Sequence, residues 1–168
     1  MSNQDRQAMN DSTTDPVCGM TVSRDSFALE HLGIQYAFCS RQCQERFKSN
    51  PHLYIGKPGE PAPRQKGVEI VKRRRFRLDH PLTDAEASIL VEALDAMMGV
   101  QHVEAAGDNV SITYDLLQAT AEQLEARIGQ VGMRLGAGWA ERLQRGFVHY
   151  VEECEIGNLE VTPHRGHH

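Results

Sequence analysis

The stretch from Asp15 to Tyr54 holds three of the four cysteines in this 168-residue chain, and we expect the molecule to be organised around it. Residues 15–20 read Asp-Pro-Val-Cys-Gly-Met, and residues 36–43 read Tyr-Ala-Phe-Cys-Ser-Arg-Gln-Cys. The cysteines are Cys18, Cys39 and Cys43. Thiolates are good ligands for soft and borderline metal ions, and such a site draws its ligands from separate chain segments. The spacing indicates a metal site with ligands from a loop, a strand end and a helix.

Local signals support this arrangement. Residues 27–31 and 34–39 read as two short strands joined by a tight turn at Leu32-Gly33. Ser40 is a good N-cap for the helix that follows. Cys43 would lie in the first turn of that helix, where unpaired backbone N–H groups favour a thiolate over a thiol. We therefore expect the helix to favour ionisation of Cys43.

The whole stretch, residues 15–55, resembles the YHS domain, a small treble-cleft metal module of the TRASH-like group. The two quoted motifs carry the resemblance, together with Phe47 and the Asn-Pro-His-Leu-Tyr sequence of residues 50–54. The resemblance implies binding of a heavy-metal ion, Cu(I) or Zn(II). It also implies heavy-metal P-type ATPases as partners, because YHS domains accompany those transporters.

The resemblance also implies the ligands. Cys18, Cys39 and Cys43 match the family's cysteines by position, and His31 is the candidate for its histidine. Met20 lies two residues after Cys18 and can lend a thioether to Cu(I), or else fill the small core of the module. The fourth ligand therefore stays open among His31, Met20, water and a partner's thiolate.

Composition limits the class of protein. A hydrophobic content of 40% is enough for a core, and a net charge of −5 gives no reason to expect nucleic acid or an anionic membrane as partner. No apolar run of about 18 residues exists, so we expect no membrane insertion. Residues 1–14 are polar, so we expect a disordered N-terminus without a signal peptide. These features favour a cytoplasmic protein with free or metal-bound cysteines, and a Cys39–Cys43 disulfide is the alternative.

The rest of the chain follows a different pattern. Residues 56–67 contain three prolines and read as a linker. Residues 68–136 read as β-α-β-β-α with a short last strand from Leu135, the order of a ferredoxin-like sandwich. The elements are expected at 68–78, 84–98, 100–105, 109–114 and 120–131.

This second region resembles a heavy-metal-associated domain in its Met98-Gly99-Val100 turn and its alternating strand at residues 110–115. That family carries Cys-x-x-Cys in the loop between the first strand and the first helix. Here residues 79–84 contain no cysteine, and His80 is the one soft-metal candidate. The resemblance therefore implies the fold and not the family's metal site.

Lys72 to Arg77 reads Lys-Arg-Arg-Arg-Phe-Arg, a dense basic run within the first expected strand. Alternate side chains of a strand face opposite sides, which is poor for a single nucleic-acid stripe. We interpret the run as a solvated edge strand that its charge protects from aggregation. If this edge binds anything, an acidic protein partner is the natural choice.

Residues 137–158 read as a C-terminal helix, followed by a histidine-containing tail at 159–168. Apolar residues recur at helical spacing, and we expect them to form core or a lid. They are Trp139, Leu143, Phe147, Tyr150 and Val151. Cys154 lies on the same helix and is interpreted as a small buried apolar residue.

The expected fold class is α+β: a treble-cleft-like module of β-hairpin and helix, linked to a ferredoxin-like βαββα domain with a C-terminal helix. The expected function is heavy-metal binding for trafficking, buffering or homeostasis of copper or zinc. A structural-zinc adaptor is one alternative, and a thiol redox protein using Cys39 and Cys43 is another. The sequence lacks a nucleophile elbow, a phosphate loop and a His-Glu-x-x-His helix, so we expect no enzyme.

Overall fold

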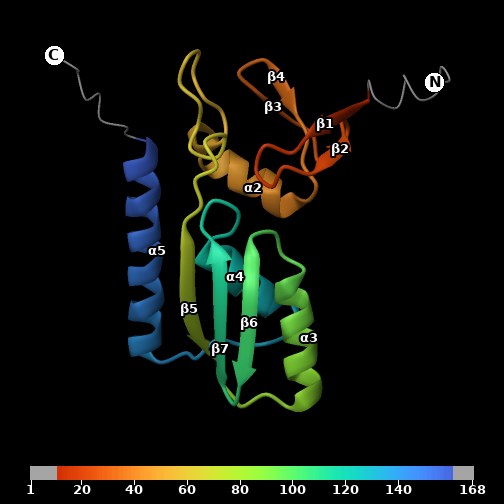
Figure 1. Cartoon of the computed structure of the whole chain (residues 1–168). Helices are drawn as coiled ribbons and strands as arrows, with labels where there is room; N and C mark the ends of the chain where they lie inside the picture. Colours follow the sequence, from red (N-terminus) through yellow and green to blue (C-terminus); the bar gives the residue numbers. More distant parts are fainter. Residues whose placement is uncertain (1–10, 161–168) are drawn as a thin grey trace. The chain divides into compact units, whose positions relative to one another are not determined.

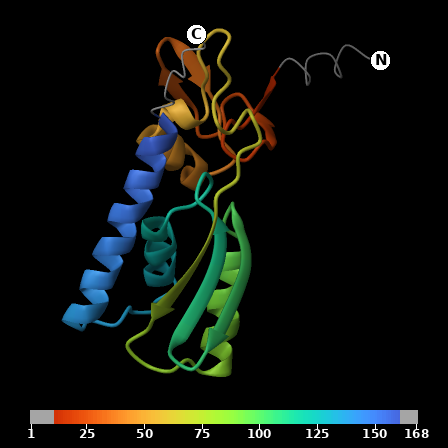
Figure 2. The same ribbon diagram turned by 60° about the vertical axis from the view of Figure 1, so that its left-hand side comes forward.

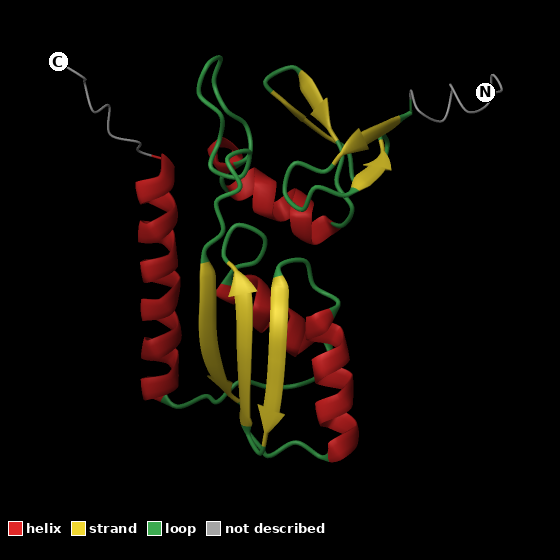
Figure 3. Ribbon diagram, viewed as in Figure 1, coloured by secondary structure: helices red, strands yellow, loops and turns green. Residues whose placement is uncertain are grey.

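The computed structural model describes residues 11–160, and the chain divides between Val68 and Glu69 into two compact units (Figure 1). Figure 3 shows that strands and helices occur in both units. The fold is therefore mixed α and β, as the sequence predicts. None of the described helices is long and apolar enough to cross a membrane.

The first unit contains two small antiparallel hairpins and one α-helix. β1 (Ser12–Thr14) pairs with β2 (Thr21–Ser23), and β3 (Leu29–His31) pairs with β4 (Ile34–Tyr36). Helix α2 (Arg41–Ser49) follows, and then a 3-10 helix, η1 (Pro51–Leu53). The expectation of disorder through residue 14 is wrong at β1, because these residues form a ladder with β2. The remainder of that expectation, residues 1–10, lies outside the described residues.

The turn between β3 and β4 forms where the sequence predicts it. Leu32 and Gly33 both have positive φ angles, 51° and 77°, as a two-residue hairpin turn with right-handed strand twist requires. The strands are shorter than expected on both sides of this turn. Phe27 has a φ of 40°, so the extended backbone begins only after it.

The ring of Phe47 lies at the centre of the first unit's core. The centroids of Tyr36 and Phe38 lie 5.0 and 5.2 Å from that of Phe47, and the centroid of Tyr54 lies at 6.0 Å. Phe47 is completely buried. Helix α2 and the segment after it are thus held to β4 through one aromatic cluster.

The linker prediction for residues 56–67 is wrong, because this segment packs onto the first unit. Ala62 is 3% exposed, and the Nε of Arg64 donates to Val17 O at 2.8 Å. A Cβ atom on Gly56 would lie 2.3 Å from Glu60 O, so the backbone approaches itself closely there. Prolines that restrict a loop and prolines that stiffen a linker look alike in the sequence.

The second unit is a three-stranded antiparallel sheet with helices against it. Its elements are β5 (Val71–Arg77), α3 (Asp84–Asp95), β6 (Val100–Ala106), β7 (Asn109–Asp115), α4 (Ala121–Gln130) and α5 (Trp139–Glu160). The strand order is β5-β7-β6, and α3 and α4 lie on one face of the sheet (Figures 1 and 2). This is the expected ferredoxin-like βαββα order. Its core is apolar on both layers and includes Phe76, Leu90, Leu94, Val110, Ile112, Leu124 and Ile128.

Both core helices of the second unit begin with a reciprocal capping box. Thr83 caps α3 with Glu86 as the returning side chain, and Thr120 caps α4 with Gln123. Each box satisfies backbone N–H groups that the first turn leaves unpaired. Helix α3 ends at Asp95, three residues before the expected end, and Gly99 at a φ of 82° leads the chain into β6.

The expected last strand is reduced to a single bridge. Leu78 and Leu135 form an isolated antiparallel bridge, with Gly136 N donating to Arg77 O at 2.8 Å. The chain then enters α5, whose bounds are Trp139–Glu160 instead of the expected 137–158. A helix therefore follows where a ferredoxin-like sheet would receive a fourth strand.

Polar contacts join α5 to the sheet and to α4. The Tyr114 hydroxyl donates a short hydrogen bond to Glu152, which is 3% exposed and also accepts from the backbone N–H of Ala121 at 3.0 Å. Lys72 Nζ lies 2.6 Å from a carboxylate oxygen of Glu155. Glu152 thus satisfies a donor at the start of α4 while it anchors α5.

Part of the expected apolar face of α5 is open to solvent. Phe147 and Tyr150 are 66% and 63% exposed, so the interpretation of both as core is wrong. Cys154 is also exposed, which overturns its interpretation as a buried residue. The side chains of Trp139 and Leu143, and the tail from residue 161, lie outside the described part of the chain.

Candidate metal centre

Three cysteine sulfurs and one carboxylate converge in the first unit. The Sγ atoms of Cys18 and Cys39 are 3.5 Å apart, and those of Cys39 and Cys43 are 3.6 Å apart. With a carboxylate oxygen of Asp15, these ligand atoms all lie within 4.8 Å of one another. In the described part of the chain this is the one group of three or more such residues close enough to hold a metal ion.

Each cysteine comes from a different element. Cys18 lies in the turn between β1 and β2, Cys39 follows β4, and Cys43 is in the first turn of α2. The Ser40 side chain caps α2 by accepting from the backbone N–H of Cys43 at 3.4 Å. The cap fixes where the helix begins, and therefore where Cys43 stands relative to Cys39.

Asp15 organises the loops that carry two of the cysteines. Its carboxylate is completely buried and accepts backbone N–H groups from Val17 at 2.8 Å, Cys18 at 3.3 Å and Cys39 at 2.8 Å. One side chain thus ties the Cys18 turn to the segment that holds Cys39. Sequence reasoning missed this role, and the available signal was an Asp before Pro, a residue type that accepts from backbone N–H groups two or three positions on.

The donor set fits a thiophilic ion. A metal bound at about 2.3 Å by tetrahedral thiolates needs sulfurs about 3.8 Å apart. The observed 3.5 and 3.6 Å are a few tenths of an ångström shorter, a difference that small side-chain rotations can supply. All three cysteines are free thiols. Soft thiolates suit Cu(I) and Zn(II), whereas the carboxylate of Asp15 is a ligand that Zn(II) accepts more readily than Cu(I).

Burial governs the protonation of the thiols in the metal-free protein. Burial, with smaller contributions from Cys39 and the Asp15 carboxylate, raises the pKa of Cys18 to about 12. The pKa of Cys43 is also strongly raised, first by burial and then by Asp15 and the other sulfurs. The expectation that the helix N-terminus favours a Cys43 thiolate is therefore wrong for the metal-free state. Metal binding must displace protons from these sulfurs.

His31, the candidate for a histidine ligand, lies outside this group. His31 packs edge-on against Phe47, with ring centroids 5.7 Å apart, so its imidazole belongs to the aromatic cluster. Met20 is 47% exposed, and its backbone carbonyl accepts from Asp15 N at 2.8 Å. The structure thus brings Cys18, Cys39 and Cys43 together and leaves His31 outside their group, whereas the backbone N–H of Met20 contacts the Cys18 sulfur. A thioether ligand from Met20 stays a prediction.

The cysteine-free loop of the second unit forms a local ion-pair cluster. His80 Nδ1 lies 2.6 Å from Asp79 Oδ1, and His80 Nε2 lies 3.5 Å from Glu86 Oε1. Hydrogen bonding to these carboxylates raises the pKa of His80. The imidazole is thus engaged by acidic neighbours, and Glu86 also caps α3.

Comparison with known proteins supports the assignment of the first unit. The model of the YHS domain matches residues 13–57 and confirms the predicted YHS-like module. No curated protein is similar enough in sequence to count as a relative.

Two solved structures resemble part of the chain at low identity. The CsoZ metallochaperone is 20% identical, with a TM-score of 0.38 over 40% of this chain and 99% of that one. Oxidized MerP from Ralstonia metallidurans CH34 is 13% identical, with a TM-score of 0.38 over 40% of this chain and 96% of that one. At this distance neither likeness bears on the function.

Proposed function

We propose that the first unit binds one soft metal ion, Cu(I) in the first place, and serves in its trafficking or buffering. The observation that carries this proposal is the convergence of three free thiols from three separate elements. The YHS match over residues 13–57 supports metal binding in general. Binding and release of the ion, not catalysis, is the task that this donor set suits.

Cys18, Cys39 and Cys43 would hold the ion as thiolates. Asp15 would keep their loops in place, because its carboxylate is already shared among three backbone N–H donors. Three thiolates satisfy Cu(I) without a fourth ligand from the protein. The bound ion is the cargo here, so the residues need only hold it and let it go.

The half-buried positions of Cys18 and Cys39 favour exchange over permanent retention. A partner's thiolate can approach these two half-buried residues and take the ion by stepwise ligand replacement. Cys43 is buried and would hold the ion on its inner side. A cytoplasmic recipient such as a heavy-metal P-type ATPase fits this chemistry and the YHS resemblance.

A structural zinc site is the second candidate, and Asp15 is the observation that favours it. With its carboxylate within 4.8 Å of all three sulfurs, the group offers the four ligands of a closed tetrahedral site. In that case the ion would hold the small first unit together, and the protein would act as an adaptor.

Metal stoichiometry and exchange separate these candidates. The untagged full chain would be purified anaerobically and loaded with Cu(I) or Zn(II), and affinity measured against chromophoric chelators. Cys39→Ser should abolish tight Cu(I) binding, and Cys154→Ser, which removes an exposed cysteine outside the group, should leave it unchanged. One tightly held ion that a competing thiol removes without unfolding supports trafficking.

Two other outcomes overturn the proposal. A zinc ion that leaves only when the first unit unfolds identifies a structural site. A reversible disulfide between two of the three cysteines, with no tight metal binding, identifies a thiol redox protein.

A further inference from the structure

The outer edge of β5 can be located from the hydrogen bonds at its end. Leu78 N donates to Asp108 O on the side of β7, and Arg77 O accepts from Gly136 N on the opposite side. Backbone groups of successive strand residues point to alternate sides. Residues 73, 75 and 77 therefore direct their N–H and C=O groups away from β7.

Most of this edge is unpaired. Gly136 engages Arg77 O, but in the part of the chain that the structure describes no backbone group pairs with those of Arg73 and Arg75. Only the Nη1 of Arg74 donates to Arg73 O, at 3.3 Å. The edge is open because the chain leaves the sheet after Leu135 and turns into α5.

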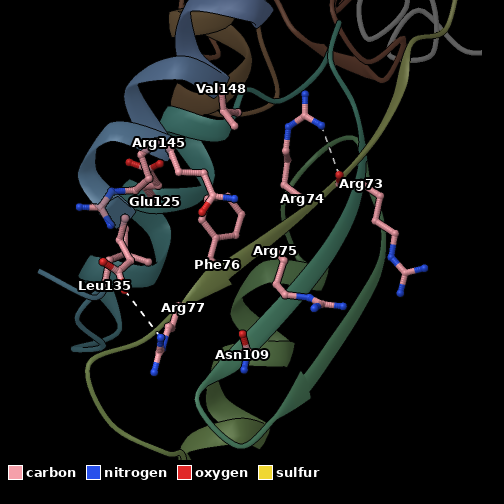
Figure 4. A pocket seen from close by; sticks show the side chains of 12 residues that line it. Arg73, Arg74, Arg75, Phe76, Arg77, Asn109, Glu125, Leu135, Arg145 and Val148 are labelled. Atoms are coloured by element: carbon pink, nitrogen blue, oxygen red, sulfur yellow. Dashed lines mark hydrogen bonds and ion pairs between the residues drawn. The ribbon is translucent and has the colours of Figure 1, made fainter. Parts of the chain in front are cut away.

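A cavity of about 460 Å³ lies beside this edge (Figure 4). Phe76 from β5, Val148 from α5, and Leu135 give it apolar walls. The charged residues that line the same space are mostly basic: Arg73, Arg74, Arg75, Arg77 and Arg145, against Glu125 and Glu141. Its size is within the range of ordinary ligand sites, and its position matches that of a missing edge strand.

The charge beside this edge is only partly neutralised. Arg73 pairs with Glu104 at 3.0 Å, and Arg77 pairs with Asp108 at 3.1 Å. Among the described residues neither Arg74 nor Arg75 forms an ion pair, and the buried Nε of Arg74 has no hydrogen-bond partner. Arg75 faces the open side of the sheet, so a carboxylate bound there would supply the partner that its guanidinium group lacks.

We propose that the slot between β5 and α5 binds an extended acidic peptide segment, which adds to the free edge of β5 as a fourth strand. Backbone hydrogen bonds to Arg73 and Arg75 would supply the pairing, as in other cases of strand addition. The segment would run antiparallel to β5, in line with the Leu78–Leu135 bridge. The proposal does not depend on the metal site.

The register of β5 sets the sequence that fits. Arg74 and Phe76 lie opposite the buried residues Ile112 and Val110, so they face the covered side of the sheet. Arg73 and Arg75 alternate with them and therefore project to the open face. Peptide residues opposite the two exposed arginines share their face and should be acidic. The residue between them points beneath α5 and should be apolar. The motif is acidic–apolar–acidic.

The first test is binding of a capped peptide of sequence Thr-Glu-Leu-Glu-Thr, followed by calorimetry and by amide chemical-shift changes. Binding should shift the amides of Arg73 and Arg75. The peptide with Lys in place of both Glu should not bind. Free glutarate should bind far more weakly than the peptide, because it has no backbone to pair.

N-methylation of the peptide tests strand pairing without changing the protein. In the proposed register the two Glu N–H groups face β5 and the Leu N–H faces away. Methylation of both Glu nitrogens should weaken binding at least about tenfold, and methylation of the Leu nitrogen should change it little.

A matched pair of protein variants tests the same point. Arg75→Pro removes an N–H that faces away from β7, a position where an edge strand tolerates proline. Arg75→Ala removes the guanidinium and keeps that N–H. The proline variant should lose more affinity than the alanine variant, provided both retain the wild-type circular dichroism spectrum.

Several results overturn the proposal. Equal effects of the two N-methylated peptides mean that no strand pairing occurs, and glutarate binding as strong as that of the peptide means a small-anion pocket. Absence of any peptide binding means that the basic edge serves only to prevent aggregation. Peptide binding that disappears in Cys39→Ser would place the peptide at the metal centre. Peptide binding and metal binding are measured separately, so a failure of the peptide proposal is distinguishable from a failure of the proposed metal function.

Discussion

At the scale of single residues, Asp15 is the side chain on which the metal centre depends most. Asp15→Asn keeps the size but replaces one acceptor oxygen with an NH₂ group, which faces a backbone donor instead of accepting from it. We expect the first unit to lose about 2 kcal/mol of unfolding free energy, since a buried donor loses its partner. Chemical denaturation measures this, and metal affinity should fall in parallel.

Asp25→Asn is the matched control for that substitution, because Asp25 is exposed in the same unit. It should change stability by no more than about 0.5 kcal/mol. Equal effects of the two substitutions would show that Asp15 does not organise the cysteine loops.

The cysteines could be predicted from the sequence, and Asp15 could not. Cys18, Cys39 and Cys43 stand out because thiols in a Cys-x20-Cys-x3-Cys pattern have few uses other than metal binding or redox chemistry. An Asp before Pro reads as an ordinary turn residue. Its importance arises from complete burial and from the N–H of Cys39, a long-range contact that no local pattern encodes.

Tyr114 should make the second unit sensitive to alkaline pH. Burial and the hydrogen bond to Glu152 raise its pKa above the ordinary value of 10.0, so the fold favours the neutral phenol. The stabilisation is fully present below about pH 10 and is lost as pH rises towards the folded-state pKa. Unfolding followed by fluorescence of Trp139, the one tryptophan, should show stability falling above pH 10.

Tyr114→Phe should lower the stability at neutral pH by about 2 kcal/mol, because the bond to a carboxylate is lost. It should also flatten the decline above pH 10. Tyr150→Phe, which alters a tyrosine that is 63% exposed, should keep the wild-type decline. An unchanged pH profile in Tyr114→Phe would assign the alkaline sensitivity to another group.

At the scale of elements, two glycines should respond to alanine with opposite signs. Gly99, between α3 and β6, has a φ of 82°, and a Cβ there would lie 2.5 Å from the Cβ of Gln118. Gly99→Ala should therefore destabilise the second unit by about 2 kcal/mol or more. Gly146, within α5, has no atom within 4 Å of an added Cβ, so Gly146→Ala should stabilise by about 0.5–1 kcal/mol.

Thermal or chemical unfolding of the two variants, monitored by Trp139, measures both changes. An unchanged stability in Gly146→Ala would mean that α5 does not contribute to the cooperative unfolding of the second unit, and a destabilising effect would mean that the added methyl group meets a neighbour. A neutral Gly99→Ala would mean that the turn can relax away from Gln118.

Helices of the second unit could be predicted closely, whereas its last strand could not. Thr83 and Thr120, each followed three residues later by Glu or Gln, mark helix starts by local chemistry alone. The strand at Leu135 depends on whether the chain continues along β5 or leaves it, and Gly136 and Gly138 permit either path. The linker prediction failed in a related way, because Arg64 bonds to Val17, far away in sequence, and Ala62 is buried.

At the scale of the whole molecule, the two units have separate cores, and the candidate ligands all belong to the first. A ligand that binds only the native form stabilises it by about 4 kcal/mol at a thousand times its Kd. The metal ion should therefore raise the unfolding midpoint of the first unit and leave that of the second unchanged.

Differential scanning calorimetry under anaerobic conditions tests this, together with the fluorescence of Trp139, a residue of the second unit. Metal should move one calorimetric transition upward while the fluorescence midpoint stays constant. The upward shift should vanish in Cys39→Ser and persist in Cys154→Ser, because Cys39 belongs to the sulfur group and Cys154 does not. A fluorescence midpoint that rises with the metal would mean that the ion binds the second unit or couples the two, and the ligand set would have to extend beyond Cys18, Cys39 and Cys43.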